Sequence, residues 1–160
     1  MKYLQDVEKF HRIFNIPVEN SPIIPHKDRC ALRVSLIQEE LNELEQAIEN
    51  NSIVGIADAL VDICYVLNGA VLEFGLQHDW KDLWNEVQRS NMSKTCNTED
   101  EAKATVQKYI EEREVEAYYK REENGYIVRR TSDDKILKSI NYSPADLKTI
   151  VEKRLFPNKF

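Results

Sequence analysis

The segment from residue 52 to residue 75 constrains the fold more than any other part of the sequence. Apolar residues occur at so many of its positions that a helix here would be apolar on every side. Such a helix is buried, either among other helices or in a membrane. Asp58 and Asp62 are the only charged residues between positions 52 and 72, and no basic anchors flank the segment. We therefore expect the central helix of a soluble bundle rather than a membrane span.

Four further helices are predicted before and after this segment. Apolar residues recur at helical spacing in them, and Thr98 opens the last one with a capping box. Their ranges are 2–14, 28–50, 79–91 and 98–113. In the longest, apolar residues lie alternately four and three positions apart, which is the pattern of a helix-packing seam. The members of this seam are Cys30, Val34, Ile37, Leu41, Leu44 and Ile48.

The chain changes character after the fifth predicted helix. Three short runs have the composition of strands, and Asn124-Gly125 and the residues around Asp133 are turn signals between them. The runs are 115–120, 126–130 and 136–140. They predict a small three-stranded sheet, and Pro144 predicts the start of a last helix. The expected fold is mainly α, with a helical bundle over 1–97 and an appendage of helix, β-meander and terminal helix over 98–160.

Composition argues against several classes of function. A net charge of −6 is opposite to the basic field that a nucleic-acid-binding surface needs. The first residues contain no apolar signal-peptide core. Three cysteines without a C-x-x-C pair indicate reduced thiols rather than disulfides or a zinc site. We therefore expect a cytoplasmic protein that binds neither nucleic acid nor a membrane.

Carboxylates are concentrated on the two long helices, and no base accompanies them. The sequence holds no Lys or Arg from position 34 to position 80. On the first of these helices, Glu39, Glu40 and Glu43 fall within an arc of about 100°. On the second, Asp58 and Asp62 lie one turn apart on the same side.

Burying a carboxylate is costly unless it is paired, protonated or bound to a metal. Carboxylate oxygens and water suit Mg²⁺ or Mn²⁺ rather than metals that prefer sulfur ligands. The pattern therefore predicts a divalent-cation site. Two alternatives stay open: Glu39 and Glu43 form a solvated helix face, or the two aspartates pair with Arg33, Arg89 or Lys94.

This acidic pattern resembles the signature of the all-α nucleoside triphosphate pyrophosphohydrolases, in their MazG-like, phosphoribosyl-ATP pyrophosphohydrolase-like branch. The family signature is EExxE on one helix and ExxD on the next. Glu39-Glu40-Leu41-Asn42-Glu43 matches the first part, and Asp62 matches the family aspartate. The family glutamate would fall at Ala59, and we expect Asp58 to serve in its place because it lies on the same side of the helix as Asp62. Flanking segments 32–33, 62–66, 89–94 and 141–147 look similar to the same branch.

The resemblance implies a homodimeric or homotetrameric helical bundle that acts on a nucleoside triphosphate. Cleavage between the α and β phosphates would give a nucleoside monophosphate and pyrophosphate, a reaction that cleanses nucleotide pools. Mg²⁺ would be held by the five carboxylates named above, and Glu40 would be the catalytic residue that orients the attacking water. The alternative is a non-catalytic helical scaffold whose acids bind a structural cation or a basic partner.

Substrate contacts are predicted around these acids and beyond the fourth helix. The candidates are Tyr65, Asn68, Arg89, Asn91 and Lys94. Tyr65 and Asn68 would meet the sugar or base. Arg89, Asn91 and Lys94 would meet phosphates. Leu32 and Leu36 are expected either beneath the base or in a dimer interface. Trp80 and Trp84 are expected in the core rather than in base stacking.

Overall fold

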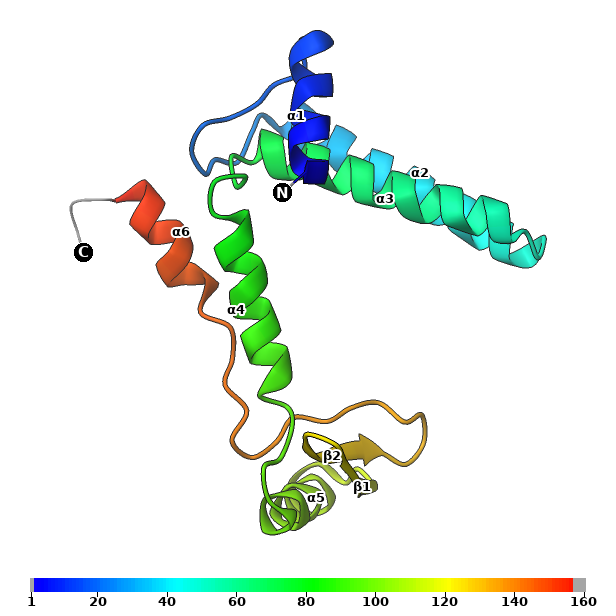
Figure 1. The fold of residues 1–160 in the computed structure, drawn as a ribbon, viewed down its shortest axis with the longest axis vertical. Helices are drawn as coiled ribbons and strands as arrows, with labels where there is room; N and C mark the ends of the chain where they lie inside the picture. Colours follow the sequence, from blue (N-terminus) through cyan, green and yellow to red (C-terminus); the bar gives the residue numbers. More distant parts are fainter. Residues whose placement is uncertain (1, 157–160) are drawn as a thin grey trace. The chain divides into compact units, whose positions relative to one another are not determined.

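The computed structural model describes residues 2–156, which are mainly helical with one small two-stranded sheet (Figure 1). The chain divides into two compact units, Met1–Asp82 with Lys148–Phe160 and Leu83–Leu147. This division differs from the predicted boundary at residues 97 and 98. The last helix groups with the first unit, where Arg154 donates two hydrogen bonds to the Asp79 carboxylate, at 2.9 and 3.0 Å.

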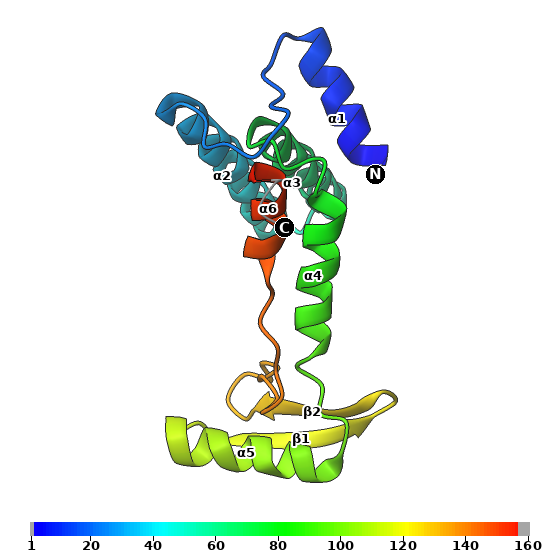
Figure 2. The same ribbon diagram turned by 90° about the vertical axis from the view of Figure 1, so that its left-hand side faces the viewer.

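The first unit is built on a pair of long helices that lie side by side in both ribbon views (Figures 1 and 2). Its elements are α1 (Lys2–Ile13), α2 (Lys27–Glu49), α3 (Ile53–Glu73) and α6 (Leu147–Leu155), and α4 (Trp80–Met92) begins in it. A tight turn joins α2 to α3, and Ser52 caps α3 by accepting a hydrogen bond from the Gly55 amide at 3.1 Å. α2 and α3 therefore run antiparallel.

The face of α2 that packs on α3 differs from the predicted seam. Val34 and Ile48 are 68% and 55% exposed, and Leu41 is also exposed. The more enclosed positions include Arg33, which is buried, and Glu40, which is half-buried. The predicted seam was wrong for Val34, Leu41 and Ile48. The spacing of apolar residues cannot show that charged side chains occupy part of the packed face.

The helix α3 is much less buried than its composition suggests. Ile53, Val54 and Val61 are 76%, 77% and 64% exposed, and the buried residues lie mostly in its last turns. The expectation of a helix buried on all sides was therefore wrong for the single chain, in which only α1 and α2 pack against it extensively. Among the described helices, α3 is the one with the length and hydropathy of a membrane span, although Asp58 and Asp62 interrupt it.

A buried ion cluster fastens α1, α2 and the end of α3 together. Arg29 and Arg33 both bind the Glu73 carboxylate, which is 1% exposed. Burial alone would raise the pKa of Glu73, but the hydrogen bonds from the two arginines outweigh burial and lower it. His11 joins the cluster through Arg33, and burial lowers its pKa, so the ring is neutral and accepts from Arg33 while contacting the Pro17 carbonyl at 3.0 Å.

The extended segment before α2, which contains Pro17, Pro22 and Pro25, lies against the end of α3. The Glu19 and Ile23 amides donate to the carbonyls of Leu72 and Phe74, at 3.0 and 3.1 Å. Gly75 ends the helix with a φ of +67°, and a Cβ there would lie 1.9 Å from the Ser21 carbonyl oxygen. Only glycine fits this crossing without displacing the segment.

The second unit packs α5 (Glu99–Arg113) against the antiparallel strands β1 (Ala117–Glu122) and β2 (Gly125–Arg130). The expectation of a third strand over 136–140 was wrong, because this segment forms only an isolated bridge from Ile136 to Arg129. The Leu137 amide still donates to the Val128 carbonyl of β2 at 2.9 Å, but the amides of Lys138 and Ile140 donate to hydroxyl oxygens of Tyr109 and Thr105 on α5, both at 3.1 Å. Side chains of α5 thus replace the ladder of a third strand.

Glu73→Gln should destabilise the first unit by about 3–5 kcal/mol, because it leaves two arginines without a buried counter-charge. Thermal or urea unfolding measures this loss, with exposed Glu49→Gln as the matched control. Because the pKa of Glu73 is lowered in the folded protein, its ionised form stabilises the fold at every pH above its ordinary pKa of 4.5. This contribution is lost as the pH falls through the lowered pKa. Equal unfolding of both variants would contradict this role for Glu73.

Candidate acidic site

The hairpin of α2 and α3 presents all five predicted acids. Glu39, Glu40 and Glu43 lie on α2, and Asp58 and Asp62 lie on α3. Glu40 and Asp62 are half-buried between the helices, and the other three are exposed. Near the turn, Glu43 and Asp58 line the same polar hollow, of about 340 Å³. The hairpin therefore brings acids from both helices to one surface.

Electrostatics centre this group on Glu40. Partial burial raises the pKa of the Glu40 carboxyl, and the negative charges of the other four acids raise it further. In order of effect, these charges are Glu43, Asp62, Glu39 and Asp58. Like charges are thus held near one another without compensation, which is the situation that a bound cation relieves.

None of the five acids forms a salt bridge with any residue that the structure describes. The three basic residues that the sequence offered as partners are engaged elsewhere. Arg33 binds Glu73, Arg89 binds Glu86, and Lys94 donates to the Asn91 side chain at 2.8 Å. The ion-pair alternative is therefore not realised among the described residues, whereas Glu39 and Glu43 are both exposed, as the solvated-face alternative also expects.

The donor set fits a hard divalent cation in its chemistry, since it consists of carboxylate oxygens. Within residues 2–156, however, no three His, Cys, Asp or Glu side chains stand together closely enough to form a ready-made metal site. One acid also has a polar neighbour, because the Ser35 hydroxyl donates to Glu39 at 3.1 Å. A cation would therefore have to draw the side chains inward.

Position 59 lies on the packed side of α3. Ala59 is 2% exposed, whereas Asp58 next to it is exposed. A carboxylate at 59 would point into the contact between the helices, and one at 58 lies beside it, near Glu43. The two positions thus approach the group of acids from different sides, and the role of Asp58 as a ligand stays a prediction.

A hollow of about 450 Å³ in the first unit contains three of the residues that the sequence connected with a substrate. Leu32, Leu36 and Tyr65 line it, together with the aromatic ring of Phe10. Tyr65 meets Phe10 edge to face at 5.7 Å between ring centroids. The hollow is mostly apolar, and the buried Arg33 of the ion cluster lies at its wall, so its lining suits a flat ring with a polar edge.

Other predicted contacts fall in different surroundings. Asn68 donates to the Cys64 carbonyl of its own helix at 2.8 Å and lines a separate apolar groove between α1 and α3. Trp80 packs against the core of the first unit, as expected. Trp84 is 65% exposed, so its assignment to the core was wrong. It follows the buried Leu83 by one residue, so its side chain points about 100° away from that of Leu83 around α4.

The three predicted phosphate contacts all lie in the second unit. Arg89 makes a two-pronged pair with Glu86, at 2.7 and 2.8 Å, and donates to the Pro144 carbonyl at 2.9 Å. This pair and the Asp146 amide lower the pKa of Glu86 to about 2. Arg89 therefore fastens the segment after Pro144 to α4, whereas Asn91 and Lys94 pair only with each other.

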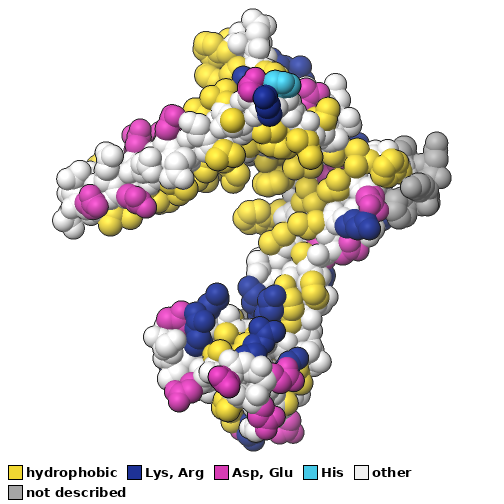
Figure 3. Space-filling view, turned by 180° about the vertical axis from the view of Figure 1, so that it is seen from behind, with side chains coloured by type: hydrophobic (Ala, Val, Ile, Leu, Met, Phe, Trp, Pro, Cys, Tyr) yellow, Lys and Arg dark blue, Asp and Glu magenta, His cyan; other side chains and the backbone are white. Residues whose placement is uncertain are grey.

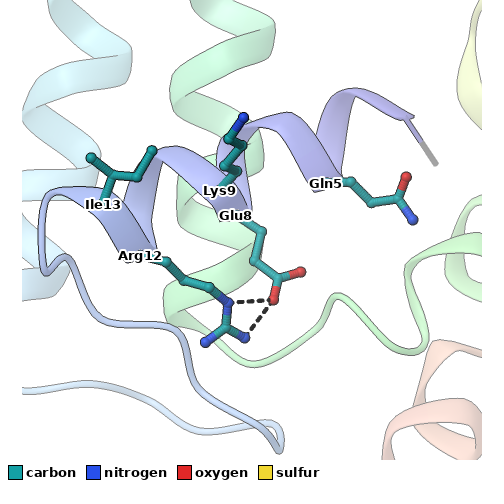
Figure 4. Close-up of a pocket in the computed structure, with 5 residues that line it drawn as sticks. All are labelled: Gln5, Glu8, Lys9, Arg12 and Ile13. Atoms are coloured by element: carbon teal, nitrogen blue, oxygen red, sulfur yellow. Dashed lines mark hydrogen bonds and ion pairs between the residues drawn. The ribbon is translucent and has the colours of Figure 1, made fainter.

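A shallow hollow on the outer face of α1 has no part in this chemistry. It has a volume of about 400 Å³, and Figure 4 shows its lining side chains on a single helix. Arg12 pairs with Glu8 there at 2.6 Å, which is an ordinary exposed pair one turn apart. No other acid lines it.

The ion cluster of Glu73 was not foreseen as a unit from the sequence. Arg29 and Arg33 are one helical turn apart at the start of α2, and Glu73 ends a helix that contains no base. These features were visible, but helical spacing cannot show that the start of α2 lies beside the end of α3. The signal that could have found it is the short turn at 50–52, which makes the two long helices antiparallel.

Comparison with known proteins now bears on this geometry. A family model described as phosphoribosyl-ATP pyrophosphohydrolase matches residues 7–91, more than half of the chain. The chain belongs to this family. The match includes α2, α3 and all five acids, and the family is typically dependent on divalent metals.

A relative from Acanthamoeba polyphaga mimivirus is an uncharacterized protein. It is 32% identical over 96 residues, which cover 56% of this chain and 38% of the viral protein. The chain thus matches well under half of that protein's length. Family membership supports a pyrophosphohydrolase-like activity in general terms.

Asp58→Asn and Asp62→Asn should each weaken Mg²⁺ binding by roughly 10–100-fold, a range seen when the surroundings of a metal site are altered. The readout is the rise in melting temperature when Mg²⁺ replaces EDTA, since only the folded state holds the ion. Without metal, both variants should melt no lower than wild type, because each removes a repelling charge. Glu45→Gln, an exposed change on α2, is the control. An undiminished rise for Asp58→Asn would remove that residue from the site.

Proposed function

We propose that this chain is a Mg²⁺-dependent nucleoside triphosphate pyrophosphohydrolase that releases a nucleoside monophosphate and pyrophosphate. The observation that carries the proposal is the group of five unpaired acids around Glu40. Its position within the part of the chain that matches the family supports it. A protein of net charge −6 needs a cation to bring a polyanionic substrate to such a surface.

The five acids would have different roles in this reaction. Glu39, Glu43, Asp58 and Asp62 would hold the cation, with Glu40 at the centre of the group. Mg²⁺ supplies neutralisation of phosphate charge and polarisation of the phosphorus when it is bound. The raised pKa of Glu40 makes its carboxylate a better base than an ordinary glutamate, so one of its oxygens can orient the attacking water and accept its proton.

The hollow beside Tyr65 would hold the base. Tyr65 lies one turn beyond Asp62 on the same helix, so the hollow and the acids are neighbours along α3. Its lining by Leu32, Leu36 and Phe10 would exclude water from a flat apolar ring. Asn91 and Lys94 belong to the second unit, and their contact with a phosphate stays a prediction, whereas Arg89 is engaged with Glu86.

We further propose that a second copy of the chain covers the exposed apolar side of α3. With the exposed Ala57 and Cys64 between them, the exposed apolar residues recur about every three positions, which makes one continuous stripe. Its members are Ile53, Val54, Leu60, Val61 and Leu67. Figure 3 shows hydrophobic side chains running along this hairpin. A stripe of this length on a soluble protein marks an interaction surface, and a homodimer or homotetramer would bury it.

Turnover should release pyrophosphate and require a divalent cation. A panel of nucleoside triphosphates, deoxynucleoside triphosphates and phosphoribosyl-ATP is assayed with Mg²⁺, with pyrophosphate and orthophosphate measured separately. Glu43→Gln and Asp62→Asn should lower the rate by about 100-fold or more while the protein stays folded. Glu45→Gln should keep the rate.

Three results would count against this activity. Orthophosphate as the first product, or full activity in EDTA, would contradict the proposed reaction. Turnover of no nucleotide, together with stabilisation by Mg²⁺, would favour the scaffold that binds a structural cation.

Light scattering should give a mass of two or four times 18.7 kDa. Val61→Glu should shift the mass toward the monomer, because it places a charge in the middle of the apolar stripe. The exposed polar change Gln46→Glu serves as control. A monomeric wild type, or an unchanged mass for Val61→Glu, would contradict the proposed interface, and partition of wild type into lipid vesicles would instead support insertion of α3.

A further inference from the structure

The second unit carries a cluster of donors around Tyr142. The Lys138 ammonium lies 4.3 Å from the centre of the Tyr142 ring. A hydrogen bond from Ser90 lowers the pKa of the Tyr142 phenol, and the positive charges of Lys138 and Lys94 lower it further. The Lys138 ammonium thus lies over the Tyr142 ring, and Lys94 follows Ser93, whose hydroxyl accepts a hydrogen bond from the Ser143 amide next to Tyr142.

Neither of these lysines has a carboxylate partner in the described part of the chain. Other bases of the unit do: Arg89 binds Glu86, Lys103 binds Glu99, and Arg130 binds Asp133. Lys94 donates only to the Asn91 side-chain oxygen, and Lys138 has only the Tyr142 ring and oxygen. Lys and Arg side chains gather visibly on this unit in Figure 3. The pair of ammonium groups therefore leaves positive charge without a counter-ion.

A hydrogen bond from α4 fixes the position of the Tyr142 phenol. The Ser90 hydroxyl, which is buried, donates to the Tyr142 oxygen at 3.0 Å. Because that bond uses a lone pair of the phenol, the phenol proton is free for another acceptor. Ser93 fixes the next residue by accepting from the Ser143 amide at 2.9 Å while donating to the Ser90 carbonyl at 2.7 Å. The donor at Tyr142 is thus positioned before any ligand arrives.

We propose that Lys94, Lys138 and Tyr142 form a binding site for a phosphate-bearing anion on the second unit. Two ammonium groups and a phenol proton converge there, and the free amide hydrogens of Asn91 lie next to Lys94. Phosphate oxygens accept strong hydrogen bonds from such charged donors. The proposal adds Lys138 and Tyr142 to the phosphate contacts already considered. The choice of pyrophosphate as the anion rests on the proposed function. The site itself is argued only from residues of the second unit.

A purely structural role for the same residues makes a different prediction. If Lys138 served only to cover the Tyr142 ring, loss of the phenol oxygen would leave anion binding unchanged, because the ring and the ammonium would remain. Tyr142→Phe therefore separates the two roles. Lys138→Arg keeps the charge above the ring and serves as the conservative variant.

The test is calorimetric titration of the full chain with inorganic pyrophosphate in EDTA at low salt. Wild type should bind without a divalent cation. Lys94→Gln, Lys138→Gln and Tyr142→Phe should each weaken binding by about 10-fold, as expected for the loss of one hydrogen bond to a charged group. Lys138→Arg should stay within about threefold of wild type. Lys135→Gln, an exposed lysine of the same segment, is the matched control and should change nothing.

Each remaining outcome decides the question. No binding by wild type in EDTA would overturn the proposal, and so would equal weakening by Lys135→Gln, which would indicate general charge attraction. Loss of this metal-free binding in Glu43→Gln would place the anion elsewhere and also overturn it. Binding that depends on Lys138 and Tyr142 in a protein that hydrolyses no nucleotide would uphold the anion site while the proposed function fails.

Discussion

The rest of the first unit depends on the contact between α2 and α3, in which opposite charges attract at one end and like charges repel toward the turn. At one end, Arg29 and Arg33 share the buried Glu73 carboxylate, so the charges attract. Toward the turn, acids from both helices stand near Glu40 without a base. The first situation stabilises the hairpin, and the second works against it. An anchored hairpin can keep repelling acids together, which is what a cation site requires before the cation binds.

The parts predicted from the sequence are those that depend on local pattern. Helical spacing and capping residues located the first five helices, and Thr98 does begin α5 as an N-cap, but α6 begins at Leu147 rather than at the predicted Pro144. The choice of the five acids followed from a long stretch without bases and from the resemblance to a known family. The structure supports their proximity, because all the other four act on the Glu40 carboxyl.

The parts that failed depend on contacts between distant segments. The third strand was expected from composition, but Tyr109 and Thr105 of α5 take the backbone donors of that segment. The seam on α2 was assigned to apolar residues, yet Arg33 and Glu40 occupy enclosed positions. An apolar helix was equated with a buried one, although one chain covers only part of α3. The pattern gave both helices correctly and the third strand wrongly, and in none of these cases could it show which distant segment the element contacts.

The central claim is that the acids of α2 and α3 hold one cation site. The most direct measurement is the anomalous diffraction of crystals grown with Mn²⁺, which reports the position of the metal itself. The account predicts a strong anomalous peak among Glu40, Glu43 and Asp62, with their side chains drawn inward. The absence of a peak there in Mn²⁺-saturated crystals, with the five acids still pointing apart, would contradict it.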